Sequence, residues 1–266
     1  MRLLPLLGAI ALLGIFLSCD DPPVTDDSPA DLGAPTPGAE VNVGYLHHTH
    51  ADLLHSPGEP LTISVDDGEL IIERLLFVIS ALELHRCAPT NELAPRPLDL
   101  LIPSAHAHVP SSATRFGTPW VEDLLGPPGS ARMAGGIAPP PGDYCELHIV
   151  LVPADDDAIN LTTTPPDEIE DHTVLISGQW RDQDQPFQPF LWTSDLRRVI
   201  PISLPDPHTG EHPLHLRDSQ QILLLIDKLL HPGLFTAVTL EHTGPDFTPF
   251  VDALIDELSL YHYDQP

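Results

Sequence analysis

The sequence predicts an all-β fold: an antiparallel β-sandwich or partly closed barrel with long loops and a short C-terminal helix. Short apolar runs with strand character recur along the chain and are separated by Pro, Gly and Asp. Proline accounts for 32 of the 266 residues, which prevents long helices nearly everywhere. Because 42% of the residues are hydrophobic and no repeat of fixed period is evident, we expect one folded domain over residues 41–266.

The first 19 residues have the composition of an export signal. Arg2 precedes an apolar run of about signal-peptide length that ends in FLSC. This ending resembles a bacterial lipobox, which predicts lipidation of Cys19; plain secretion and a retained membrane helix are the alternatives. Residues 20–40 consist mainly of Asp, Pro, Gly, Ala and Ser, so we expect a disordered tether. The predicted location is the cell envelope, lipid-anchored and facing the periplasm or the cell surface.

Charge and cysteine content agree with an exported protein. The chain has 11 basic and 39 acidic residues, and its formal charge of -28 disfavours nucleic acid as a partner. The same charge attracts divalent cations, although acidity of this kind also serves solubility. With Cys19 assigned to lipid, Cys87 and Cys145 remain and are predicted to form a disulfide. Two separate buried thiols are the alternative, and zinc binding by Cys is a weak one because there is no CxxC pair.

The predicted elements follow from local patterns. In residues 144–151 the alternation places Tyr144 outward and Cys145 inward, as a structural disulfide requires. Near the C-terminus, Phe250, Leu254 and Leu258 have helical spacing behind a Thr-Pro start, which predicts a short closing helix. The clearest strand segments are residues 60–87, which contain a DDG turn, and residues 144–154, 172–180, 197–204, 221–230 and 235–243.

Two histidine pairs are the candidate metal ligands. HHTH contains His48 and His50, and AHAH contains His106 and His108. On a strand, residues two apart lie on one side at about 7 Å between Cα atoms, close enough to chelate one metal. Two such pairs supply four nitrogens, which suits copper(II) first and zinc second. The alternative is that these histidines are solvated loop residues.

An acidic segment and several further histidines are weaker ligand candidates. The segment VPADDDAINL lacks the spacing and the glutamate of an EF-hand, so a solvated acidic turn is favoured over a calcium loop. The chain has no GxSxG, GxGxxG or P-loop pattern, and we expect no enzymatic activity. The spare candidates are His47, His55, His85 and His148, with Asp52 as a carboxylate that orients or supplements them, and a looser cluster of His208, His212 and His215.

Three segments together resemble the MbnP-like family, periplasmic copper-binding β-sandwich proteins associated with methanobactin operons. LLFVISALEL carries Ser80 and Leu84 at the positions of a strand motif, and PPPGDYCELHIVL carries a P-x-G-x-Y turn that ends at Tyr144. PFLWTSDLRRVIPI supplies an aromatic Phe190 and Trp192. The resemblance covers roughly residues 41–240, but the two histidine pairs do not match the family's copper ligands residue by residue. The strand and turn arrangement is also similar to that of DUF4382-type lipoproteins.

The resemblance implies copper as the cofactor and a diheme peroxidase-like protein as a partner. It also makes Trp192 the analogue of a tryptophan that is oxidised to kynurenine in the family, against the alternative of a structural core residue. The predicted function is therefore a lipid-anchored protein that binds copper, or alternatively zinc, for sequestration or delivery. A structural or interaction lipoprotein without metal and a metallohydrolase with an open coordination position are the alternative functions.

Overall fold

The computed structural model describes the chain from residue 39 to residue 264, with gaps. The compact unit Pro37–Pro266 contains all of these residues. Two residues assigned to the tether belong to the fold, since Ala39 is buried and Glu40 begins the first strand. The rest of the predicted tether, the predicted export signal and Cys19 lie outside the described residues. The described ranges are residues 39–50, 53, 56, 58–65, 68–87, 111–129, 131–161, 169–182, 185–204, 213–241 and 244–264.

The described chain is mostly β, with several sheets and no closed barrel, so the predicted fold class is confirmed. Sheet A has the strand order β16-β13-β1-β7, and its two central strands, β1 and β13, run parallel. This pair joins segments about 180 residues apart, which local patterns do not reveal. The strands of sheet A are β1 (Glu40–Thr49), β7 (Arg132–Ile137), β13 (Gln221–Leu230) and β16 (Ser259–Asp264).

Sheets B and C follow one another along the chain through β3 and β4. Ser80, which separates these two strands, is buried, and its hydroxyl donates to the carbonyl oxygen of Val152 at 2.6 Å and accepts from the Val152 N–H at 3.1 Å. Sheet B has the order β10-β9-β3-β2, with β6 also on β3. Its strands are β2 (Leu61–Val65), β3 (Gly68–Ile79), β6 (Trp120–Asp123), β9 (Val174–Asp182) and β10 (Gln188–Ser194).

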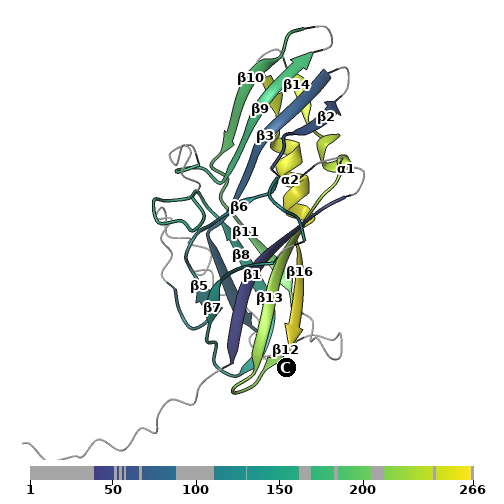
Figure 1. The fold of residues 1–266 in the computed structure, drawn as a ribbon. Coiled ribbons are helices and arrows are strands. Elements are labelled where there is room, and N and C mark those ends of the chain that lie inside the picture. Colours follow the sequence, from purple (N-terminus) through teal and green to yellow (C-terminus); the bar gives the residue numbers. More distant parts are fainter. Residues whose placement is uncertain are drawn as a thin grey trace, which may run out of the picture. The chain divides into compact units, whose positions relative to one another are not determined.

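Sheet C has the order β11-β8-β4-β5, with β12 also on β8. Figure 1 shows sheets A and C together in one half of the unit, and sheet B beside helices α1 and α2 in the other. The larger of two hydrophobic core clusters runs through both halves, and the smaller one includes Leu76, Val121 and Leu175 of sheet B. The strands of sheet C are β4 (Ala81–Arg86), β5 (Arg115–Phe116), β8 (Gly142–Leu151), β11 (Arg198–Ser203) and β12 (Leu214–Leu216).

The segment between β13 and β16 carries the helices. It contains α1 (Pro232–Phe235), the ribbon β14 (Thr239–Glu241) and β15 (Gly244–Asp246), and α2 (Thr248–Asp256). Phe247, just before α2, stacks on Phe190 of β10 at 5.5 Å between ring centroids and lies 5.9 Å from Trp192. Trp192 is half-buried and packs against the hydrophobic core.

Helix α2 confirms the predicted C-terminal helix, but the helix ends at Asp256 and Leu258 lies beyond it. The chain closes with β16 because the last residues pair with β13. The predicted strand 235–243 is wrong in its first part. Phe235 ends α1 with its ring packed on Phe250, and of the described residues in this segment Thr239–Glu241 form a strand. Of the described helices, none is long and apolar enough to cross a membrane.

Cys87 and Cys145 form the predicted disulfide. The predicted facing of β8 is wrong at its first residues, because Tyr144 is fully buried and Cys145 is half-buried. The pairing of β4 with β8 skips Cys145, so an extra residue sits in β8 at this point and shifts the alternation. The Tyr144 hydroxyl donates to the carbonyl oxygen of Pro140 at 2.8 Å, which holds the P-x-G-x-Y turn.

Candidate functional site

His48 and His50 lie at the carboxyl end of β1. His48 is the penultimate residue of the strand and pairs with Leu229 of β13. The backbone N–H of His50 donates to the carbonyl oxygen of Leu230 at 2.7 Å. The backbone pairing of β1 with β13 therefore fixes the positions of both histidines. Both histidines are exposed. The two predicted ligands that fall in the described part of the chain are thus placed at a hydrogen-bonded strand end with their side chains exposed.

The ring of His48 is held by one carboxylate. Nδ1 of His48 lies 2.9 Å from Oδ1 of Asp227, and the two side chains are 47% and 7% exposed. An ionised carboxylate only accepts hydrogen bonds, so Nδ1 is the donor. Within the described residues Nε2 of His48 has no hydrogen-bond partner. In the neutral ring Nε2 therefore presents a lone pair toward solvent, which is the usual arrangement of a metal-binding histidine.

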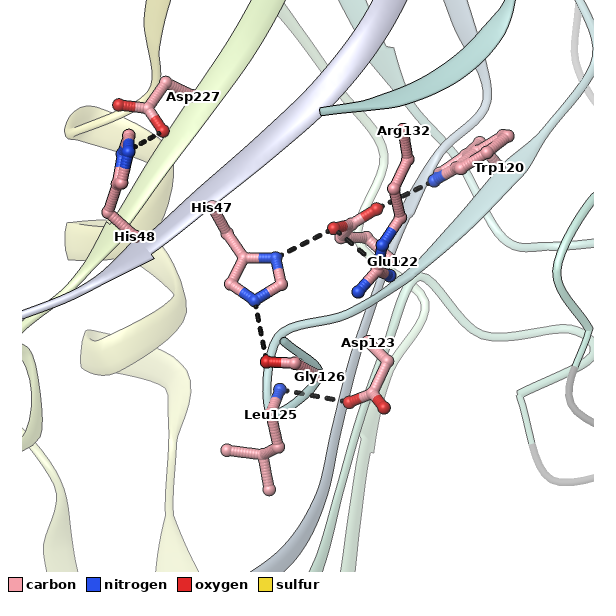
Figure 2. Close-up of polar contacts among 9 residues, drawn as sticks. All are labelled: His47, His48, Trp120, Glu122, Asp123, Leu125, Gly126, Arg132 and Asp227. Carbon is pink, nitrogen blue, oxygen red and sulfur yellow. Dashed lines mark hydrogen bonds and ion pairs between the residues drawn. The ribbon is translucent and has the colours of Figure 1, made fainter. Parts of the chain in front are cut away.

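His47, a spare candidate, is buried and points to the other side of β1 (Figure 2). Nδ1 lies 3.0 Å from Oε1 of Glu122, and Nε2 lies 3.1 Å from the carbonyl oxygen of Gly126. Both oxygens are acceptors when Glu122 is ionised, so both hydrogen bonds form only when the ring carries two protons. His47 consequently ties β1 to β6 and the turn after it, and both of its nitrogens are engaged.

Glu122 is the centre of a buried polar cluster. Its Oε2 accepts from Nε1 of Trp120 at 2.8 Å, and Arg132 lies 3.6 Å from its Oε1. Burial raises the pKa of Glu122, but the hydrogen bond from His47, the charge of Lys228, the bond from Trp120 and the charge of Arg132 outweigh burial and lower the pKa to about 2. Glu122 is thus a carboxylate at all ordinary pH values.

Lys228 completes this cluster and is the only lysine in the chain. It is fully buried, its amine lies 5.1 Å from the ring centroid of Tyr45, and Nζ has no hydrogen-bond partner among the described residues. Burial lowers its pKa to about 8, against the opposing charges of Glu122 and Asp227. Burial also raises the pKa of Tyr45 well above its ordinary range.

Asp227 and Lys228 are not among the site residues predicted from the sequence, although the sequence contains a signal for them. The two charges stand together in the otherwise apolar strand QILLLIDKLL. On a strand, consecutive residues face opposite sides, so one of the two must be buried in the sandwich. In the structure both are buried, with Asp227 turned toward His48 and Lys228 toward the core.

His85 and His148, two further spare candidates, meet on sheet C. Their rings stack at 3.7 Å between centroids. Nε2 of His148 contacts Oε2 of Glu146 at 2.9 Å, and Nε2 of His85 lies 3.8 Å from Oε2 of Glu83. The pKa of Glu83 is lowered, first by the neighbouring His85 ring and then by the charge of Arg115, against burial. Each ring therefore faces a glutamate on its own strand, and the two do not converge on a common point.

Several predicted groups lie outside the described residues, so the meeting of the two histidine pairs stays a prediction. Within the described part of the chain, no group of three or more His, Cys, Asp or Glu residues is arranged to hold a metal ion. Asp156 and Asp157 are exposed in a turn, as expected for a solvated acidic loop. The undescribed candidates are Asp52, His55, His106, His108, His208 and His212.

Comparison of the chain with family models, curated proteins and solved structures finds no match. The resemblance to the MbnP-like family therefore rests on the three segments alone. Two of its motif residues, Ser80 and Tyr144, have the structural roles described above.

Proposed function

We propose that this protein binds a transition metal, copper ahead of zinc, for sequestration or delivery. His48 and His50 would supply one pair of ligands, and His106 and His108 the second pair. The observation that supports this function is the arrangement of His48. Its ring is exposed, its Nδ1 is bonded to a buried carboxylate, and its Nε2 is unengaged within the described residues.

The electrostatics of the chain favour cation binding. A formal charge of -28 concentrates divalent cations near the surface. Imidazole nitrogen binds copper(II) and zinc as the neutral base, so protons compete with the metal. The affinity should therefore fall as the pH drops through the titration range of histidine.

The setting of this function is proposed from the sequence. An export signal that ends at Cys19 would anchor the protein to a membrane by lipid, facing the periplasm or the cell surface. The disulfide between Cys87 and Cys145 suits such an oxidising compartment. From the family resemblance, a diheme peroxidase-like protein is the proposed partner, and binding rather than catalysis is the proposed role.

A metal titration of the purified protein tests the proposal. We expect uptake of copper(II) by the wild type and loss of uptake in a variant with His48→Ala, His50→Ala, His106→Ala and His108→Ala. A control with His215→Ala and His231→Ala removes two histidines outside the proposed ligand set, whose carboxylate partners, Asp143 and Glu257, are exposed whereas Asp227 is buried, and this control should bind as the wild type does. Absence of copper and zinc uptake by the wild type, or equal uptake by the four-histidine variant, would refute metal binding at these residues.

A further inference from the structure

Asp227 is an unusual residue in its strand. It lies in β13, where the residue as a whole is 5% exposed, and it is flanked by apolar residues and Lys228. Among the described residues, its carboxylate accepts one side-chain hydrogen bond, from Nδ1 of His48. A buried carboxylate is costly unless it is paired and hydrogen-bonded. Within the described part of the chain, the direct partner of this buried charge is therefore a ring that can itself carry or bind a cation.

Lys228 does not take this role, although it follows Asp227 in sequence. In the parallel register Lys228 pairs with His47, whose side chain is turned to the core, and the lysine amine lies over the ring of Tyr45. Its Nζ makes no hydrogen bond within the described part of the chain. The negative charge of Asp227 is therefore directed at His48, as the close-up of the two residues shows (Figure 2).

We propose that Asp227 is a positioning residue that holds His48 in the tautomer with the proton on Nδ1 and so directs Nε2 to the metal. This inference rests on the proposed function and names the coordinating atom of the site. A carboxylate bonded to the far nitrogen fixes the orientation of the ring and raises the basicity of the nitrogen that binds the metal. A cation bound at Nε2 also compensates the buried charge of Asp227 through the ring.

The tautomer can be measured without any metal. In the metal-free protein with ¹⁵N-labelled histidine, at a pH where His48 is neutral, long-range ¹⁵N–¹H correlations distinguish a protonated Nδ1 from a protonated Nε2. We expect His48 to carry its proton on Nδ1, with the resonance assigned through the variant His48→Gln. In Asp227→Ala the ring loses its acceptor, and we expect the two tautomers to mix.

Copper affinity provides the second measurement, made by competition with a chelator. Removing a carboxylate of this kind typically weakens metal binding 10- to 100-fold, which we expect for Asp227→Ala. Asp227→Asn keeps the size but removes the charge and should also weaken binding. The control is Asp143→Ala, because Asp143 contacts Nδ1 of His215 at 2.6 Å in a solvent-exposed pair outside the proposed ligand set. This control should bind copper with unchanged affinity.

The outcomes separate the inference from the function on which it rests. A wild-type protein that takes up no copper refutes the proposed function. Copper uptake that is equally tight in wild type and Asp227→Ala refutes the positioning role alone. If the Asp227 variants fail to fold, the wild-type spectrum still decides, because a proton on Nε2 of His48 overturns the inference and a proton on Nδ1 supports it.

Discussion

Replacing Lys228 with methionine tests the account of the buried cluster most directly. Lys228 is fully buried, and its amine has no hydrogen-bond partner among the described residues. Burial lowers its pKa from the ordinary value of 10.5 to about 8, while the charges of Glu122 and Asp227 oppose this lowering. Methionine has a similar length without the amine, so Lys228→Met removes the cost of a desolvated charge and keeps most of the packing.

The size of the effect follows from the two pKa values. At about 1.4 kcal/mol for each pH unit, the difference corresponds to about 3 kcal/mol. Because the folded pKa lies below that of the unfolded chain, the unfolded chain binds more protons between pH 8 and pH 10.5. The stability of the wild type therefore rises with pH through this window. Below pH 8 both states are protonated, and the full cost of the buried charge is present.

Denaturant unfolding of both proteins between pH 7 and pH 10, at constant ionic strength, measures the effect. We expect Lys228→Met to be more stable by about 1–3 kcal/mol at pH 7 and this advantage to shrink toward pH 10. Since Lys228 is the only lysine in the chain, NMR of ¹³C-labelled lysine gives a single side-chain signal whose titration reports the pKa directly. A pKa near 10.5, or a stability difference that is constant with pH, would refute the desolvation argument.

Two further predictions concern packing and cross-linking. Gly178 of β9 pairs with Ile72 next to a β-bulge in β3, and a Cβ there would clash with the backbone oxygen of Ile71. Gly178→Ala should lower the free energy of unfolding by about 1–3 kcal/mol. The control is Gly136→Ala, whose Cβ would lie 3.2 Å from Asn42 Oδ1, and it should lower the free energy of unfolding by less. Replacing Cys87 and Cys145 with alanine removes a cross-link between residues with a sequence separation of 58. Because the unfolded chain then gains conformational entropy, the free energy of unfolding should fall by about 4 kcal/mol. Thermal unfolding of the variant under non-reducing conditions, compared with the wild type, checks this loss, and an equal melting temperature would contradict it.

Local patterns predicted the elements well where each residue acts through its own neighbours. The turn residues and apolar runs placed β2 to β4, β8, β9, β11 and β13, and the Thr-Pro start placed α2. The alternation argument failed at Tyr144 and Cys145 because a bulge depends on the partner strand as well as on the strand itself. The helical spacing at Leu258 was outweighed by the pairing of β16 with β13, since tertiary contacts override weak local preferences.

At the candidate site, too, local features were predicted from the sequence, whereas contacts between distant segments were not. The sequence predicted that His48 and His50 lie together on a strand or a loop, and it named Asp52, which lies outside the described residues, as a supporting carboxylate. The structure pairs His48 with Asp227 across a separation of 179 residues. The sequence also treated His47 as a possible ligand. The structure instead engages both of its nitrogens with Glu122 and Gly126, which are 75 and 79 residues away.

By itself, the amino-acid sequence determined that this chain forms an all-β fold with a C-terminal helix and a disulfide between Cys87 and Cys145. These features depend on strand periodicity, on proline and glycine, and on the count of cysteines, all of which are local or compositional. Only the tertiary structure decided that β1 and β13 lie side by side in parallel. The periodicity of a strand determines which face a side chain occupies, but the identity of the neighbouring strand and its register depends on packing of the whole core. That packing brings the carboxylate of Asp227 next to His48 and buries His47 and Lys228.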